Sequence, residues 1–110
     1  MIADSLEGND LDIVVAKALG LDSSAPLPLF HSDWAVAGPI IERERISIGF
    51  GDGMWFANYV DTSGFLDVNK PVCRALSPIV AAMRCFVAHA NGEPGLSLLL
   101  AEAPRGTVKQ

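Results

Sequence analysis

The stretch from Ser77 to Gly92 constrains the fold most strongly, because it carries the clearest helix pattern in the chain. Ser77 suits a helix cap, Pro78 suits the first helical position, and Gly92 suits a left-handed stop. The apolar residues between them recur at the spacing of one helical face. We therefore predict a helix over 77–91 whose apolar face packs on the core. The members of that face are Ile79, Val80, Met83, Phe86, Val87 and Ala90.

The opposite face of this helix is small and weakly polar, with Ala81, Arg84 and Ala88 along it. A helix face in water usually carries charged side chains such as Lys and Glu. We therefore expect a second element of the chain, or another subunit, to cover this face. Two interpretations of Arg84 stay open: it anchors a carboxylate from another element or subunit, or its stem covers apolar surface while its guanidinium stays in water.

The length of 110 residues suits one domain over 1–110, with frayed ends at 1–8 and 104–110. Half of the residues are hydrophobic and only 19% are charged, which argues against a disordered chain. No apolar run approaches the roughly 20 residues that span a bilayer, and the first residues lack a signal-peptide pattern. We therefore expect a cytoplasmic protein with no membrane contact.

The net charge of −5 disfavours direct nucleic-acid binding, which draws its affinity from Lys and Arg next to phosphates. The acidic excess lies near the start of the chain, at Asp4, Glu7, Asp10, Asp12 and Asp22. Carboxylates near a helix N-terminus are favourable and improve solubility, which is the simpler interpretation. The alternative is an acidic surface that a basic partner recognises.

Two more helices are predicted before the centre of the chain. The first covers about 10–19, capped by Asn9 or a nearby acidic residue and stopped by Gly20. The second covers about 34–44 and is capped by Asp33. Pro39 interrupts the second pattern, because proline removes a backbone donor and clashes with the preceding turn. We expect one short turn there, followed by a restart with Pro39 in the first turn.

A β-hairpin is predicted over about 46–60, because the hydrophobic period changes to two and Asp52-Gly53 is a strong hairpin turn. A two-residue loop pairs Phe50 with Trp55, whereas a three-residue loop pairs Phe50 with Met54, and both pairings are apolar. Two strands alone are rarely stable, so a third is expected from 65–68, from Leu96 to Leu100, or from a partner chain. The segment 61–75 otherwise suits a loop with at most one short strand.

The expected fold class is α/β (α+β), with a small antiparallel sheet and flanking helices in an α-β-α sandwich.

Catalytic and metal-binding patterns are lacking in the sequence. His31-Ser32-Asp33 holds the residue types of a hydrolase triad, but neighbours in sequence rarely align as one, so helix capping by Ser32 or Asp33 is expected. Neither His31 nor His89 has metal-ligand spacing, and Cys73 and Cys85 suit two reduced thiols. We predict no catalytic residue, no metal and no cofactor.

Several blocks of residues resemble the NinX-like family of small bacteriophage proteins over roughly 11–93. The resemblance implies a phage or prophage accessory protein in a host bacterial cell, with an α-β-α sandwich and no established activity. The chain departs from the family after Glu93, and Arg45 stands where a turn-forming residue is expected. The blocks are 15–20, Ser32-Asp33-Trp34, 38–44, Trp55-x-Ala57, Pro78, Ala81-Ala82-Met83-Arg84 and 86–88.

The leading functional hypothesis is a non-enzymatic module that binds a host or phage protein. The first alternative is an acidic decoy of a host DNA-binding protein, and the second is a small ligand-binding protein or enzyme with a pocket near the two tryptophans. A homodimer is also expected, either through the small-residue face of the last helix or through an open sheet edge. The candidate interaction or pocket residues are Trp34, Trp55, Ala81, Arg84 and Ala88.

Overall fold

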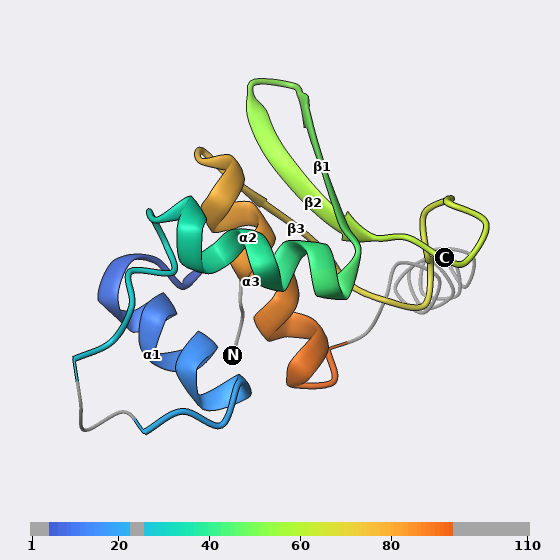
Figure 1. Ribbon diagram of the computed structural model, residues 1–110. Helices are drawn as coiled ribbons and strands as arrows, with labels where there is room; N and C mark the ends of the chain where they lie inside the picture. The colour runs from blue at the N-terminus through green and yellow to red at the C-terminus, as the bar shows by residue number, and fades with distance from the viewer. Residues whose placement is uncertain (1–4, 23–25, 94–110) are drawn as a thin grey trace, which may run out of the picture.

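The last helix, α3 (Pro78–Ala90), lies at the centre of the fold, as its apolar pattern predicts (Figure 1). The computed structural model describes residues 5–22 and 26–93. Within them, α3 contacts all three strands and both other helices. The α+β class is therefore confirmed. The other elements are α1 (Gly8–Ala18), α2 (Trp34–Glu44), β1 (Ile46–Gly51), β2 (Met54–Tyr59) and β3 (Val72–Ala75).

Both ends of α3 form as the sequence predicts. The Ser77 hydroxyl accepts a hydrogen bond from the Val80 N–H at 3.4 Å, and Pro78 occupies the first turn. Gly92 adopts a φ of +73° just after the helix, a conformation that costs glycine little. The local signals for the start and the stop are thus sufficient to place this helix.

α3 is buried on both sides rather than on one. On the side toward the sheet, the Cys85 thiol contacts the Pro71 carbonyl and the His89 ring lies 4.6 Å from the Tyr59 ring of β2, whereas Phe86 of the apolar stripe lies beneath Arg43 of α2. α1 packs mainly on α3, and three of its apolar side chains are fully buried: Leu11, Val15 and Ala16. Ala81 and Ala88 are fully buried as well, so elements of this same chain cover the small-residue face of α3.

The predicted caps and breaks of the first two helices are partly wrong. Asn9 lies inside α1, which begins at Gly8, and the N-cap residue Glu7 makes no side-chain cap bond. Asp33 caps α2 as predicted, accepting from the Ala35 N–H at 2.9 Å. However, α2 runs through Pro39 without a break. Gly38 precedes the proline and has no Cβ, which removes one of the clashes that a proline ring makes with the residue before it.

The sheet has the order β1-β2-β3 and is antiparallel throughout. Asp52 and Gly53 form a two-residue loop with positive φ at both positions, so Phe50 pairs with Trp55. The third strand is 72–75, within the segment expected to be mostly loop, and not 65–68. Only an isolated bridge joins Val60 to Leu66. The strand predicted at Leu96 to Leu100 lies outside the described residues.

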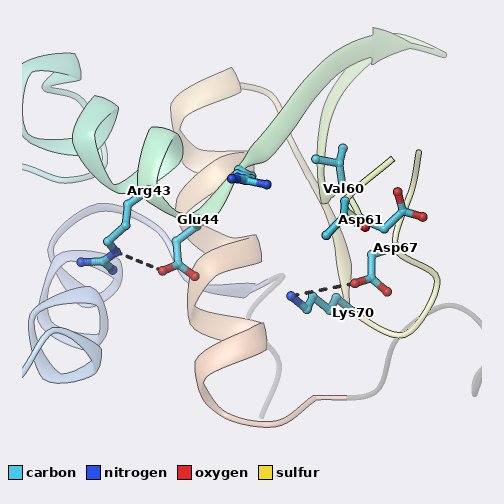
Figure 2. Close-up of a pocket in the computed structure, with 8 residues that line it drawn as sticks. Arg43, Glu44, Val60, Asp61, Asp67 and Lys70 are labelled. Carbon is cyan, nitrogen blue, oxygen red and sulfur yellow. Dashed lines mark hydrogen bonds and ion pairs between the residues drawn. The ribbon is translucent and has the colours of Figure 1, made fainter. Parts of the chain in front are cut away.

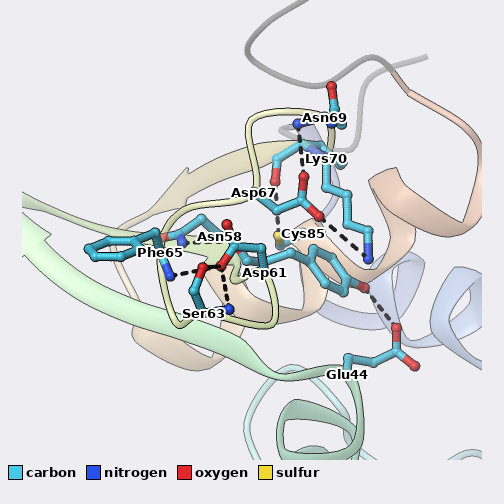
Figure 3. Close-up of polar contacts among 11 residues, drawn as sticks. Glu44, Asn58, Asp61, Ser63, Phe65, Asp67, Asn69, Lys70 and Cys85 are labelled. Atoms are coloured by element: carbon cyan, nitrogen blue, oxygen red, sulfur yellow. Dashed lines mark hydrogen bonds and ion pairs between the residues drawn. The ribbon is translucent and has the colours of Figure 1, made fainter.

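One face of the sheet carries the core. Tyr59, Ala57 and Cys73 are almost fully buried there against the helices. The Cys85 thiol on α3 donates to the Pro71 carbonyl at 3.3 Å (Figure 3), and neither cysteine forms a disulfide. The hairpin extends beyond this core, so its outer half is more exposed than its base (Figure 1).

Candidate functional site

A polar pocket lies between the C-terminal end of α2 and the loop that follows β2 (Figure 2). Its volume is about 330 Å³, near the lower limit for small-ligand sites. Three cationic and three acidic side chains line it, together with Val60 and Thr62. The charged residues are Arg43, Glu44, Arg45, Asp61, Asp67 and Lys70.

Two aspartates hold the loop of residues 61–70, here called the 61–70 loop. Asp61 Oδ1 accepts from the Ser63 N–H at 2.9 Å, the Ser63 hydroxyl at 2.8 Å and the Phe65 N–H at 3.1 Å. These bonds, the Ser63 hydroxyl first, lower the pKa of Asp61. Asp67 Oδ1 accepts from the Asn69 N–H at 3.0 Å. The loop backbone is therefore fixed by its own side chains (Figure 3).

Tyr59 joins this loop to α2 from beneath the pocket. Its hydroxyl donates to Glu44 Oε1 at 3.0 Å, while Arg43 Nε donates to Glu44 Oε2 at 3.1 Å. The Lys70 ammonium lies 5.0 Å from the centre of the Tyr59 ring, a cation–π contact. The side chain of Glu44 is thus held by two donors, and the lysine is held above the tyrosine ring.

The pKa of Tyr59 is raised far above its ordinary value. Burial is the main cause, because removing the ring from water penalises the phenolate, and the hydrogen bond to Glu44 adds to it. A raised pKa in the folded state means that the tyrosine stabilises the fold fully below about pH 10, and that this contribution is lost as the pH rises further.

We expect alkaline pH to destabilise the wild-type protein more than a Tyr59→Phe variant. Phenylalanine keeps the ring in the core but has no proton to lose, so the extra loss of stability above about pH 10 should disappear. Urea unfolding of both proteins across that pH range measures the difference. Because Tyr59 is the chain's single tyrosine, the tyrosinate absorbance reports its titration directly. Parallel pH dependence in the two proteins would contradict this assignment.

Around the pocket, the acceptors make more hydrogen bonds within the protein than the donors do. Glu44 and Asp61 accept several hydrogen bonds each. In contrast, Arg43 makes one hydrogen bond through Nε, and Lys70 lies only within 3.9 Å of Asp67. A guanidinium has five N–H donors and an ammonium has three. Within residues 5–22 and 26–93, several donors of the pocket are therefore unused, and these donors suit an incoming carboxylate or other acceptor.

Exposed apolar side chains accompany this pocket on the 61–70 loop. Phe65 is 73% exposed, Leu66 39% and Val68 42%. Figure 3 shows Phe65 on the side of the loop away from Glu44 and Lys70. The loop thus presents to solvent three apolar side chains that do not pack in the core.

The two tryptophans lie apart from this pocket. Trp34 is the first residue of α2 and is 50% exposed, whereas Trp55 on β2 is half-buried. The Phe50 and Trp55 rings meet edge to face, with centroids 5.1 Å apart. A second pocket, of about 230 Å³, is lined by Arg84, and neither it nor the first is lined by a tryptophan. Of the three residues named for a pocket, Arg84 lines this second pocket, and the tryptophans line neither of the two.

The small-residue face of α3 does not reach the surface. Ala81 and Ala88 have no exposed area, so they contact the rest of this chain and offer nothing to a partner. Arg84 binds backbone carbonyls rather than a carboxylate, with Nε donating to Leu6 at 2.7 Å and Nη1 to Arg74 at 2.7 Å. This face was expected to be covered either by a second element of the chain or by another subunit, and the structure shows that the same chain covers it.

His31 does have a carboxylate partner, but it is Asp12 and not Asp33. Asp12 is 1% exposed and accepts from the His31 N–H at 2.9 Å and lies 2.8 Å from His31 Nδ1. The pair ties α1 to the segment before α2. Sequence reasoning missed it, and the one available signal was an aspartate among the apolar residues of an amphipathic helix.

Metal-binding and membrane-spanning features are also lacking in the parts that the structure describes. Among residues 5–22 and 26–93, no group of three His, Cys, Asp or Glu side chains is arranged to hold a metal ion. Within the same ranges, each helix is too short or too polar to cross a bilayer.

The structure is that of an α+β protein with a polar pocket beside a rigid, partly apolar loop. Residues 28–90, more than half of the chain, match the family model described as Bacteriophage P22, NinX. The chain therefore belongs to this bacteriophage family, and the resemblance seen in the sequence is confirmed. Membership of this family supports a phage accessory protein. A comparison with curated proteins found no match. The matched segment includes the pocket and the whole 61–70 loop.

Proposed function

We propose that this phage accessory protein is a non-enzymatic module that binds a host or phage protein through the 61–70 loop. The single observation that carries this proposal is the exposure of Phe65, Leu66 and Val68 on a loop with a fixed backbone. A rigid loop loses little conformational entropy when a partner covers it. Apolar side chains on such a loop are also the groups that supply binding energy at protein interfaces.

The pocket beside the loop supports the same function. The side chain of Arg43 is 58% exposed, and both Arg43 and Lys70 retain donors that no other described residue uses. Charged groups at the rim of an interface mainly set specificity and the rate of association. A partner with an apolar residue next to a carboxylate would complement both the loop and the pocket.

The decoy alternative receives less support from the positions of the acidic residues. A phosphate-like array needs several free carboxylates on one face. Asp12 is buried against His31, Asp33 caps α2, and Asp61 and Asp67 accept hydrogen bonds within the 61–70 loop. These carboxylates act in the fold, so we favour the protein-binding module.

The test is affinity capture from phage-infected host lysate with three immobilised proteins. They are the wild type, a Phe65→Ser/Val68→Ser double variant, and Leu21→Ser, a matched control that is 45% exposed and lies outside the loop. We expect the wild type and the control to retain the same discrete protein, and the double variant to lose it. The affinity of the purified partner should fall at least about tenfold in the double variant.

The proposal fails if the wild type retains nothing beyond bare resin, or if the double variant retains the same protein equally well. Measurable turnover of a metabolite by the purified wild type would favour the enzyme alternative instead. Circular dichroism of each variant establishes that lost binding does not reflect lost structure.

A further inference from the structure

β1 is an edge strand with an open side. It pairs with β2 only, and the described residues supply no other strand beside it. The Val60 N–H donates to the Arg45 carbonyl, which fixes the alternation of the β1–β2 ladder. The backbone N–H and C=O groups of Ser47, Gly49 and Gly51 therefore point toward β2. The backbone N–H and C=O groups of the residues between them point outward.

The outward groups belong to Ile46, Ile48 and Phe50. Within the described residues, no hydrogen bond outside the ladder uses them. Edge strands are normally protected by a charge, a proline, a bulge or a covering segment, because unpaired backbone groups invite another strand. β1 has the sequence ISIGFG, without a charge or a proline. β3, at the other edge, contains Arg74 and follows Pro71.

We propose that two copies of this chain pair through their β1 edges, antiparallel and about a two-fold axis at Ile48, into one continuous sheet. In this register Ile46 of one copy lies opposite Phe50 of the second copy, and all the outward groups of both strands are paired. Two three-stranded sheets would then merge into one. The proposed dimer contact does not use the 61–70 loop, and it shares only Arg45 with the pocket beside that loop.

A second copy suits this edge because the strand is complementary to itself. It is uncharged, so self-pairing brings no like charges together along its length. The two-fold register also places Arg45, just before the strand, beside the Gly51-Asp52 end of the second copy. Arg45 is exposed and makes no side-chain hydrogen bond or ion pair in the described residues, and Asp52 is likewise exposed. Each end of the paired strands thus brings together one cation and one anion.

Pairing also covers apolar surface at the outer half of the hairpin. Phe50 is 60% exposed, although it lies on the same face of the sheet as the buried Ala57. Opposite residues in an antiparallel pair share one face, so Phe50 would pack beside Ile46 of the second copy. The exposure of this aromatic side chain in the single chain is then explained.

Analytical ultracentrifugation of the full chain at micromolar concentration tests the proposal. We expect the wild type to sediment as a dimer, and Phe50→Pro as a monomer. Proline at 50 removes an outward N–H but no bond to β2, so the fold should survive. Phe50→Ala is the matched control: it loses the same ring but keeps the N–H, so it should dimerise more strongly than the proline variant.

Charge reversal gives a second test that does not depend on Phe50. Arg45→Glu and Asp52→Arg should each raise the dimer dissociation constant about tenfold, and the two changes combined should restore it. A monomeric wild type at micromolar concentration would overturn the proposal. So would a dimer that neither Phe50→Pro nor the single charge reversals weaken, because that dimer would use another surface.

Discussion

Replacing Asp12 by alanine is expected to destabilise the protein by about 3 kcal/mol, one of the two largest effects that a single substitution should produce. The Asp12 carboxylate is 1% exposed and contacts both the backbone N–H and the ring of His31, 2.9 and 2.8 Å away. Alanine would leave the part-buried His31 N–H without its acceptor and would open a small void beside α1. Both effects reduce the free energy of unfolding.

Urea denaturation of Asp12→Ala beside Asp10→Ala measures this effect. Asp10 lies on the same helix but is exposed, so its loss should change the stability by less than about 1 kcal/mol. Asp12→Asn should fall between the two, because an amide oxygen still accepts from the His31 N–H. An Asp12→Ala variant as stable as Asp10→Ala would show that the pair with His31 contributes little.

Replacing Arg84 by methionine is expected to destabilise the protein by about 2–3 kcal/mol. The guanidinium donates to the carbonyls of Leu6 and Arg74, both at 2.7 Å, and so joins α3 to the N-terminal segment and to β3. Methionine keeps the apolar stem but provides no donor. Lysine should not rescue the loss, because one ammonium lacks the fixed geometry that serves two carbonyls at once.

Hydrogen exchange adds a readout that global stability does not give. In Arg84→Met, the amides of α1 should exchange faster than those of β1 and β2, because the lost bond to Leu6 acts on the N-terminal segment. Arg43→Met is the matched control, since the Arg43 side chain is 58% exposed and surface ion pairs contribute little. Equal exchange rates in the two variants would contradict the role assigned to Arg84.

Features encoded by neighbouring residues could be predicted from the sequence. α3 carries its own cap, apolar spacing and stop, so its position follows from local chemistry. The Asp52-Gly53 turn is equally local, although both candidate registers were apolar and only the structure distinguishes them. One short strand was allowed within 61–75, but its position at β3 was not predicted because Val72, Cys73 and Ala75 show little alternation. That strand forms because β2 offers it an edge, which no local pattern reports.

Contacts between residues far apart in the sequence, and the candidate site among them, could not be predicted. Asp12 and His31 are 19 positions apart, and Leu6 and Arg84 are 78 apart. No spacing rule joins such pairs. The small residues of α3 correctly indicated a covered face, but the same pattern fits both a partner subunit and another element of the same chain. The pocket likewise arises where the end of α2 meets the 61–70 loop.

The two cysteines have a practical consequence for anyone who studies this protein. Cys73 on β3 and Cys85 on α3 are both buried on adjoining elements at the centre of the fold. A thiol reagent in solution can reach them only when the contact between the sheet and α3 opens. The rate at which a thiol reagent labels Cys73 and Cys85 therefore measures how often the contact between the sheet and α3 opens, without any added probe.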